Sequence, residues 1–184
     1  MKEGTGTLPV KRLLDYVRLL PDASLNVKFL ENDWANLHCG RSRTKIAGMS
    51  KETFPELAAM PPVLAELPAN LLSTMIGRTI FAISSEESRF TLSGGLLQLQ
   101  EDRVTMVTTD GHRMALVRTR NGGPVLSGVS FRTIIPRKAM GELLKLCGDA
   151  GESGAIRFAA NDNHLFFQAG ERILISRKLT GTFP

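Results

Sequence analysis

The sequence contains few cysteines and no long apolar runs. Its two cysteines, Cys39 and Cys147, match no disulfide framework, zinc site or CxxC redox motif. We expect both to be small buried hydrophobic residues in a reducing compartment. No stretch approaches the roughly 18 apolar residues that a membrane span needs, and the N-terminus has no signal-peptide core. The sequence therefore predicts a soluble, cytoplasmic protein.

Histidine is also scarce, and this limits the chemistry available to the chain. The three histidines lie far apart in the sequence, and no HExxH, CxxC or nucleophile-elbow motif occurs. One stretch still raises the question of catalysis, because Asp110, Gly111, His112 and Arg113 are consecutive. Asp110 and His112 could be half of an acid/base pair or two ligands of a metal. Alternatively, the Asp-Gly pair could form a tight turn between two strands.

The overall composition is that of a globular protein with excess positive charge. Hydrophobic residues make up 42% of the chain and charged residues 22%, which argues against disorder. The formal net charge is +5. This excess permits binding to a polyanion such as a nucleic acid, but an ordinary solvated surface is the alternative until the charges are placed in a fold.

One supersecondary unit occurs three times in the chain. Each copy opens with a branched apolar residue and a proline, and the copies begin at Leu8, Leu67 and Ile135. The prolines suit the first turn of a helix, where a missing N–H costs nothing. Apolar residues then follow at helical spacing. The stripes predicted to be buried are Val10, Leu13, Leu14 and Val17, then Leu71, Leu72, Met75 and Ile76, then Met140, Leu143, Leu144 and Cys147.

After each helix the hydrophobic period changes from 3.6 to 2. Each copy continues with three strands joined by two short turns, and the second turn always holds a glycine, at Gly40, Gly111 and Gly170. The repeat is therefore a helix followed by a three-stranded meander. One such unit cannot cover its own sheet and helix stripe, whereas two packed together can. We expect an α+β fold with helices on one face of antiparallel sheets.

The repeats also predict the domain organisation. A segment near residues 55–66, with several prolines and polar breaks, is typical of a connector. Residues 63–184 then hold two units and form a complete domain. Residues 1–62 hold one unpaired unit together with the connector. Because an unpaired half-domain is physically unusual, we expect the chain to be part of something longer.

The repeat favours the structural interpretation of the Asp-Gly stretch. Gly111 stands where Gly40 and Gly170 stand, so it serves a turn that every copy makes. Asp-Gly is a strong hairpin signal because both central positions of a type I′ turn need positive φ. We therefore predict a turn at Asp110 and Gly111, with no catalytic residue and no metal. The turn leaves His112 unexplained, together with the arginine that follows it.

Several segments resemble the bacterial DNA polymerase III sliding clamp, the β subunit. They are FAISSEESRFTLSGGLLQL, VTTDGHRMALVR, IIPRKAMGELLKL and SRKLTGTFP, with LPVKRLLDYVRLLPD and GRSRTKIAGMSKETFPEL in the opening unit. Residues 1 to about 60 resemble the second half of the first clamp domain, and the remainder resembles the complete middle domain. The resemblance implies the DNA-clamp fold, a non-enzymatic processivity function without a cofactor, and a homodimeric ring around duplex DNA.

In the clamp architecture the helices line the central hole, and the charges of this sequence agree with that placement. The non-core faces of the three predicted helices carry seven basic and two acidic residues. Lys and Arg in a hole can exchange phosphates without reading bases, as sequence-independent sliding requires. The implied DNA contacts are Lys11, Arg18, Arg78, Arg137, Lys138 and Lys145 on the helices, with Arg89 and Phe90 beside the hole.

The resemblance also implies a pocket for linear peptides of the DNA polymerase III catalytic subunit, the clamp loader and repair proteins. Its wall would be Leu92, Thr109, Gly111, His112, Arg113, Met114 and Pro184. In this reading His112 and Arg113 frame the pocket, while Leu92 and Met114 offer apolar surface to a peptide anchor. Met114 replaces the family's usual leucine, a swap that conserves volume. Ile46 is predicted at the dimer contact.

Two other functions stay open on the sequence alone. A stand-alone basic nucleic-acid-binding protein could reuse the clamp fold without forming a ring. Steep salt dependence without peptide affinity would distinguish it. A small hydrolase could instead use Asp110 and His112, and its signature would be loss of turnover in a folded His112→Ala protein.

Overall fold

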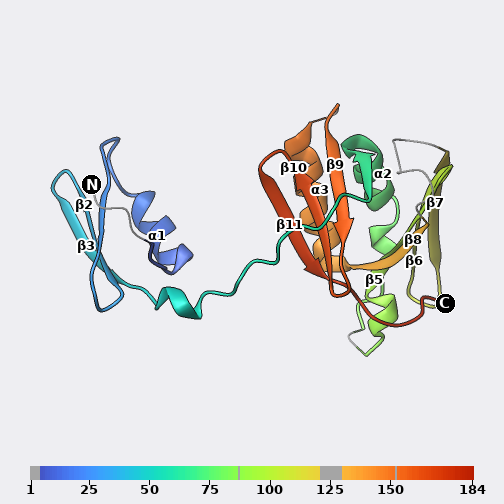
Figure 1. Cartoon of the computed structure of the whole chain (residues 1–184), viewed down its shortest axis with the longest axis horizontal. Coiled ribbons are helices and arrows are strands. Elements are labelled where there is room, and N and C mark those ends of the chain that lie inside the picture. Colours follow the sequence, from blue (N-terminus) through green and yellow to red (C-terminus); the bar gives the residue numbers. More distant parts are fainter. Residues whose placement is uncertain (1–4, 87, 121–129, 152) are drawn as a thin grey trace. The chain divides into compact units, whose positions relative to one another are not determined.

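The computed structural model describes residues 5–86, 88–120, 130–151 and 153–184. The chain divides into two compact units, Met1–Leu57 and Ala58–Pro184 (Figure 1). The first unit contains α1 (Val10–Val17), β1 (Asn26–Phe29), β2 (Trp34–Cys39), β3 (Ser42–Ala47) and the 3-10 helix η1 (Lys51–Thr53). Its strands form an antiparallel sheet in the order β1-β2-β3, as the meander pattern predicts.

The first unit has a small core between its sheet and α1. The core consists of Ala35, Leu37 and Ile46, with Leu8, Leu13, Tyr16 and Leu25 packed against them. The stripe predicted on α1 is largely wrong, because Val10, Leu14 and Val17 are exposed. Leu13 and Tyr16 are three residues apart and so share a face of the helix. Within the described part of this unit, that face alone meets the sheet.

The second unit contains two four-stranded antiparallel sheets and two helices. The sheets have the strand orders β11-β10-β9-β4 and β7-β6-β5-β8. Its elements are β4 (Ala65–Pro68), α2 (Ala69–Gly77), η2 (Ile80–Ala82), η3 (Phe90–Leu92), β5 (Gly94–Gln100), β6 (Arg103–Thr109), β7 (Met114–Arg120), β8 (Phe131–Pro136), α3 (Arg137–Ala150), β9 (Ala155–Ala160), β10 (His164–Ala169) and β11 (Arg172–Arg177).

A strand that the sequence did not predict precedes each helix of the second unit. β4 leads into α2 but pairs with β9 of the other repeat, with Leu67 opposite Ile156. β8 leads into α3 but pairs with β5, with Ile135 opposite Gly95. The apolar-proline pairs that mark these two repeats are therefore strand ends, and each helix begins at the next residue. Each repeat thus donates one strand to the sheet of the other.

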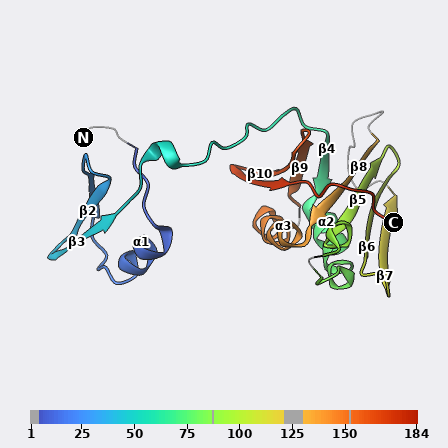
Figure 2. The ribbon, with the colours of Figure 1, turned by 90° about the horizontal axis from the view of Figure 1, so that it is seen from below.

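The two helices pack against each other on one side of the sheets (Figure 2). The stripes predicted on α2 and α3 are confirmed for the buried residues Leu72, Met75, Ile76, Met140, Leu143 and Cys147. Strand side chains complete this core. The Phe158 ring lies 5.4 Å from that of Phe131 and 5.2 Å from that of Phe167, measured between centroids. Sheets backed by helices on one face confirm the α+β class.

Both cysteines are free thiols and are buried in the described structure. Burial raises the pKa of the Cys147 thiol to about 11, because a thiolate is poorly solvated in an apolar core. This agrees with the prediction of small hydrophobic residues. No helix among the described residues is both long enough and apolar enough to cross a membrane.

Candidate functional site

The loop between β6 and β7 is organised around the carboxylate of Asp110. Its Oδ1 accepts hydrogen bonds from the backbone N–H groups of His112 and Arg113, both at 3.0 Å. The backbone N–H of Asp110 donates to the carbonyl of Arg113 at 3.4 Å. The residues at the tip are therefore Gly111 and His112. Of the two, only Gly111 has a positive φ, of 92°, so the predicted type I′ turn at Asp110 and Gly111 is wrong.

The same hydrogen bonds favour the ionised form of Asp110. The backbone N–H of His112 and then that of Arg113 lower the pKa of the Asp110 carboxyl below its ordinary value, because they stabilise the charged form. Thr109 supports the loop from below: its Oγ1 donates to the carbonyl of Arg113 at 2.7 Å and accepts from the N–H of Gly111 at 3.1 Å. Thr109 is 9% exposed and acts mainly as this support.

Two arginines tie the loop to neighbouring segments of the chain. Arg113 Nε lies 3.0 Å from Asp110 Oδ2, and its Nη2 donates to the carbonyl of Phe81 at 3.0 Å. Its guanidinium also stacks 5.7 Å from the centre of the Phe81 ring. Arg89 donates to the carbonyl of Asp110 at 3.0 Å and pairs with Glu86 at 3.0 Å. We call residues 89–92 and 109–114, held together in this way, the rim.

The rim presents exposed apolar side chains on the outer face of its sheet. Met114 pairs with Thr109, and Leu116 pairs with Val107, so their side chains share the face opposite the core. Met114 is 67% exposed and Leu116 50% exposed. Leu92, at the end of η3, is half-buried. An apolar surface on a loop held rigid by hydrogen bonds and ion pairs is suited to bind the side chains of a peptide.

The C-terminal segment crosses another part of the same sheet face. Leu179 donates its N–H to the carbonyl of Ile134 at 3.4 Å. Phe183 is 5% exposed and packs on Leu96 and Ile134, while Arg132 Nη2 donates to the Phe183 carbonyl at 3.3 Å. A cavity of about 290 Å³ lies beside this segment, lined in part by Leu96, Leu179 and Phe183.

The C-terminal segment also passes against the loop that carries Leu92. Gly181 has a φ of 117°, and a Cβ built on it would lie 2.6 Å from Thr91 Cγ2. The segment therefore lies next to the rim. Pro184, predicted in the pocket wall, is exposed and follows directly after buried Phe183. The structure thus gathers Thr109, Gly111, His112, Arg113 and Met114 in one loop, with Leu92 and the C-terminal segment nearby.

The loop has no arrangement for acid/base or metal chemistry. The Asp110 carboxylate is occupied by two backbone N–H groups and by Arg113, so it does not orient the His112 imidazole. Among the described residues no group of three or more His, Cys, Asp or Glu side chains could hold a metal ion. The structural interpretation of the Asp-Gly stretch accounts for its geometry.

The basic residues predicted to contact DNA on the three helices are all exposed: Lys11, Arg18, Arg78, Arg137, Lys138 and Lys145. Lys145 pairs with Glu142 at 2.9 Å. Arg137 and Lys138 lie in the first turn of α3, which has no acidic residue and no side-chain cap. Cations are unfavourable at this positive end of a helix dipole, so helix stability does not explain them.

The structure shows the surroundings of Arg89, Phe90 and Ile46 but does not test the contacts predicted for them. The Arg89 side chain is committed to Glu86 and to the loop, and Phe90, 71% exposed, lies in the rim. Ile46 is 6% exposed in the core of the first unit, although its strand β3 is an edge strand. Contacts of these three residues with DNA or a second subunit stay predictions.

The comparisons with known proteins agree on one family. Residues 66–184 match the family model described as DNA polymerase III beta subunit, central domain. The chain belongs to the beta sliding clamp family. The beta sliding clamp of Chlamydia pneumoniae is 36% identical over 186 residues, which cover 100% of this chain and 49% of the relative. That of Synechococcus elongatus is 34% identical over 185 residues, with coverage of 100% and 49%.

Solved structures of beta sliding clamps have the same fold. The DNA polymerase III subunit beta from Pseudomonas aeruginosa superposes with a TM-score of 0.86 at 28% identity, covering 96% of this chain and 48% of that chain. A sliding clamp from the same organism bound to griselimycin gives 0.83 at 28% identity, covering 96% and 47%. The clamp-family chain described here spans about half the length of the relatives it matches.

Membership of the beta sliding clamp family confirms the resemblance seen in the sequence and the clamp fold. The family consists of non-catalytic processivity factors of DNA replication, so the hydrolase interpretation of Asp110 and His112 is wrong. The sequence did not predict the residues that hold the two arginines of the rim, above all Phe81 and Glu86. Both residues lie in the segment FAISSEESRFTLSGGLLQL that carries the resemblance, but the segment does not indicate their partners, and the sequence separation between Phe81 and Arg113 hides their contact.

Proposed function

We propose that this clamp-family chain contributes the basic faces of its helices to a ring around duplex DNA and docks short linear peptides at the rim. The expected peptides belong to the DNA polymerase III catalytic subunit, the clamp loader and repair proteins, and the expected ring is a homodimer. One observation carries the proposal: exposed Met114 is mounted on a loop that Asp110, Arg113 and Arg89 hold in place.

Peptide docking is supported by the combination of exposure and rigidity. Contiguous exposed apolar side chains often mark interaction sites, and Met114 and Leu116 are neighbours on one sheet face. Because the loop is already cross-tied before a ligand arrives, little conformational entropy is lost on binding. Methionine is a flexible apolar side chain that adapts to varied anchors, which suits a surface that serves several partners.

Duplex binding is supported by basic residues at helix N-termini, where they do not stabilise the helix. Arg137 and Lys138 are exposed at the end of α3 that disfavours cations. Lys11 stands likewise in the first turn of α1, which has no acidic residue. Phosphate contacts of this kind position a protein on DNA without reading bases. The stand-alone nucleic-acid-binding alternative uses the same charges, but it gives no role to Met114 and Leu116.

Titration with griselimycin tests the docking surface. We expect the amide signals of residues 109–114 to shift in a two-dimensional NMR spectrum of the full chain. Met114→Asp should weaken binding at least about tenfold, because it removes an apolar contact and buries a charge. Ile173→Asp is the matched control, since Ile173 is 47% exposed on β11 of the other sheet. Unshifted 109–114 signals, or equal losses in both variants, would contradict the proposal.

A further inference from the structure

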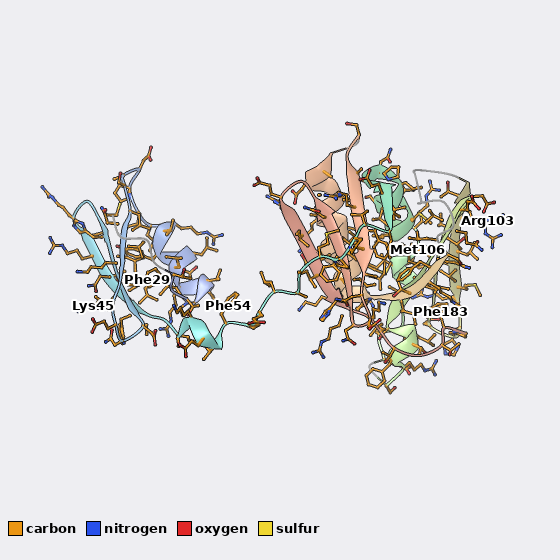
Figure 3. The ribbon with its side chains drawn as sticks, viewed as in Figure 1. Phe29, Lys45, Phe54, Arg103, Met106 and Phe183 are labelled. Carbon is orange, nitrogen blue, oxygen red and sulfur yellow. The ribbon has the colours of Figure 1, made fainter. Side chains whose placement is uncertain are left out.

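The sheet of the first unit has a second face, turned away from α1. Along β2 the side chains of Ala35, Leu37 and Cys39 are buried, so Trp34, Asn36 and His38 point to the opposite side. Strand pairing adds neighbours to this row. The face, which we call the outer sheet face, consists of Lys28, Trp34, Asn36, His38, Arg43 and Lys45. Figure 3 shows Lys45 on the side of the sheet away from α1.

The outer sheet face is basic and its charges are free. β1, β2 and β3 contain Lys28, Arg43 and Lys45 but no Asp or Glu. All three cations are exposed, and none of them forms an ion pair or hydrogen bond within the part of the chain that the structure describes. In the register, Lys28 and Lys45 stand on either side of Asn36. An anionic chain lying along β2 would meet a cation on both flanks.

The same face offers two aromatic rings. Trp34 is 41% exposed and His38 is half-buried, and they stand at either end of the β2 row. Between them, Asn36 Oδ1 is buried and finds no hydrogen-bond donor among the described residues, although buried polar atoms are normally paired. A hollow of about 680 Å³ opens here, lined by Asn36, Leu37, His38, Arg43, Thr44 and Lys45.

We infer that the outer sheet face binds single-stranded nucleic acid. Lys28, Arg43 and Lys45 contact phosphates, and bases stack on Trp34 and His38. Side chains two residues apart on a strand are about 7 Å apart, so the row can meet an extended chain of nucleotides one after another. A charged groove with aromatic platforms is the usual design for sequence-tolerant single-strand binding.

The rings decide between a single strand and other anions. An acidic peptide would satisfy the three cations, but it would leave Trp34 and His38 without a stacking partner. Duplex DNA offers phosphates, but its bases are stacked inside and cannot reach an indole on a sheet. The outer sheet face is also distinct from the helix faces and the rim, so this inference does not rest on the proposed function.

The chain contains a single tryptophan, so fluorescence excited selectively at tryptophan reports on this face alone. A single-stranded oligothymidylate added to the full chain should quench the fluorescence of Trp34. The logarithm of its binding constant should fall against the logarithm of the salt concentration with a slope of about −2, since each of three phosphate contacts contributes about −0.7. The same emission should respond much less to a duplex of equal length or to polyglutamate.

Charge-reversal variants test whether oligothymidylate binds to the cations of the outer sheet face or only responds to the net charge of the chain. Arg43→Glu combined with Lys45→Glu should weaken oligothymidylate binding at least about tenfold and flatten the salt slope. The matched control is Arg118→Glu combined with Arg177→Glu, which changes net charge equally on exposed strand residues of the second unit. Circular dichroism of each variant confirms that it is folded.

Aromatic variants test stacking with a labelled oligonucleotide and fluorescence anisotropy. Trp34→Ala should lower affinity at least about fivefold, and Trp34→Phe should restore most of it. Two results would overturn the inference: equal losses in the face and control charge variants, or tighter binding of polyglutamate than of oligothymidylate. The second result would reassign the face to an acidic protein partner.

Discussion

Reversing the charges at the start of α3 should separate stability from DNA binding. The helix begins at Arg137 with Pro136 before it, and its first turn has neither a side-chain cap nor an acidic residue to offset the positive end of the helix dipole. A cation there costs about 0.3–1 kcal/mol and an anion gains a similar amount. Arg137 and Lys138 are both exposed, so the low end of this range applies.

The double variant Arg137→Glu and Lys138→Glu should therefore raise the free energy of unfolding by about 1–2 kcal/mol. For a unit of this size, the rise corresponds to roughly 3–8 °C in Tm, measurable by circular dichroism at low salt. Duplex affinity should fall, and its salt slope should decrease by about 1.8, or 0.9 for each lost phosphate contact. Arg118→Glu with Arg177→Glu serves as the strand control, with little change in Tm.

The Tm tests the effect of these charges on the helix dipole, and the duplex affinity tests their contact with DNA. A higher Tm with unchanged duplex affinity would remove these residues from the DNA surface. A lower Tm in a protein that still folds would show that the first turn of α3 is not governed by its dipole, and that Arg137 or Lys138 makes a stabilising contact instead.

Two further predictions concern the rim and the segment beside it. The folded-state pKa of Asp110 is lowered, so its stabilising effect is complete above the ordinary value near 3.9 and is lost as pH falls through the folded pKa. The difference in unfolding free energy between wild type and Asp110→Asn should therefore be constant above about pH 5 and shrink in acid, and a constant difference down to pH 2 would refute this assignment. Gly181→Ala should destabilise the second unit by about 1–3 kcal/mol, since Gly181 has positive φ and the added Cβ would clash with Thr91. The control Gly141→Ala, in α3 with open space around it, should stabilise by about 0.5–1 kcal/mol in the same thermal unfolding assay, and equal effects of the two alanines would contradict the contact.

Local patterns were sufficient to predict most elements of the fold. Alternating apolar residues predict all the meander strands, and the stripes on α2 and α3 are buried as expected because each helix meets the other and a sheet. On α1 the same rule failed for Val10, Leu14 and Val17. Periodicity says which residues share a face, but only packing decides which face is covered.

The features that the sequence did not predict depend on distant partners. β4 is four residues long and becomes a strand because β9, about ninety positions later, pairs with it. The resemblance named Arg113 as part of a pocket wall, but its fixed position comes from Asp110 and from the carbonyl of Phe81. Turn propensity predicted a reversal of the chain at Asp110 and Gly111. The hydrogen bonds of Asp110 instead place Gly111 and His112 at the tip.

The strand exchange between the two repeats makes the second unit a single cooperative body. Each four-stranded sheet draws its outermost strand from the other repeat, since β4 closes the sheet of β9–β11 and β8 closes that of β5–β7. Removing either repeat would strip a strand from the survivor and expose an unpaired edge open to aggregation. Two repeats joined in this way cannot become independent folding domains, so α2, α3 and the rim unfold together.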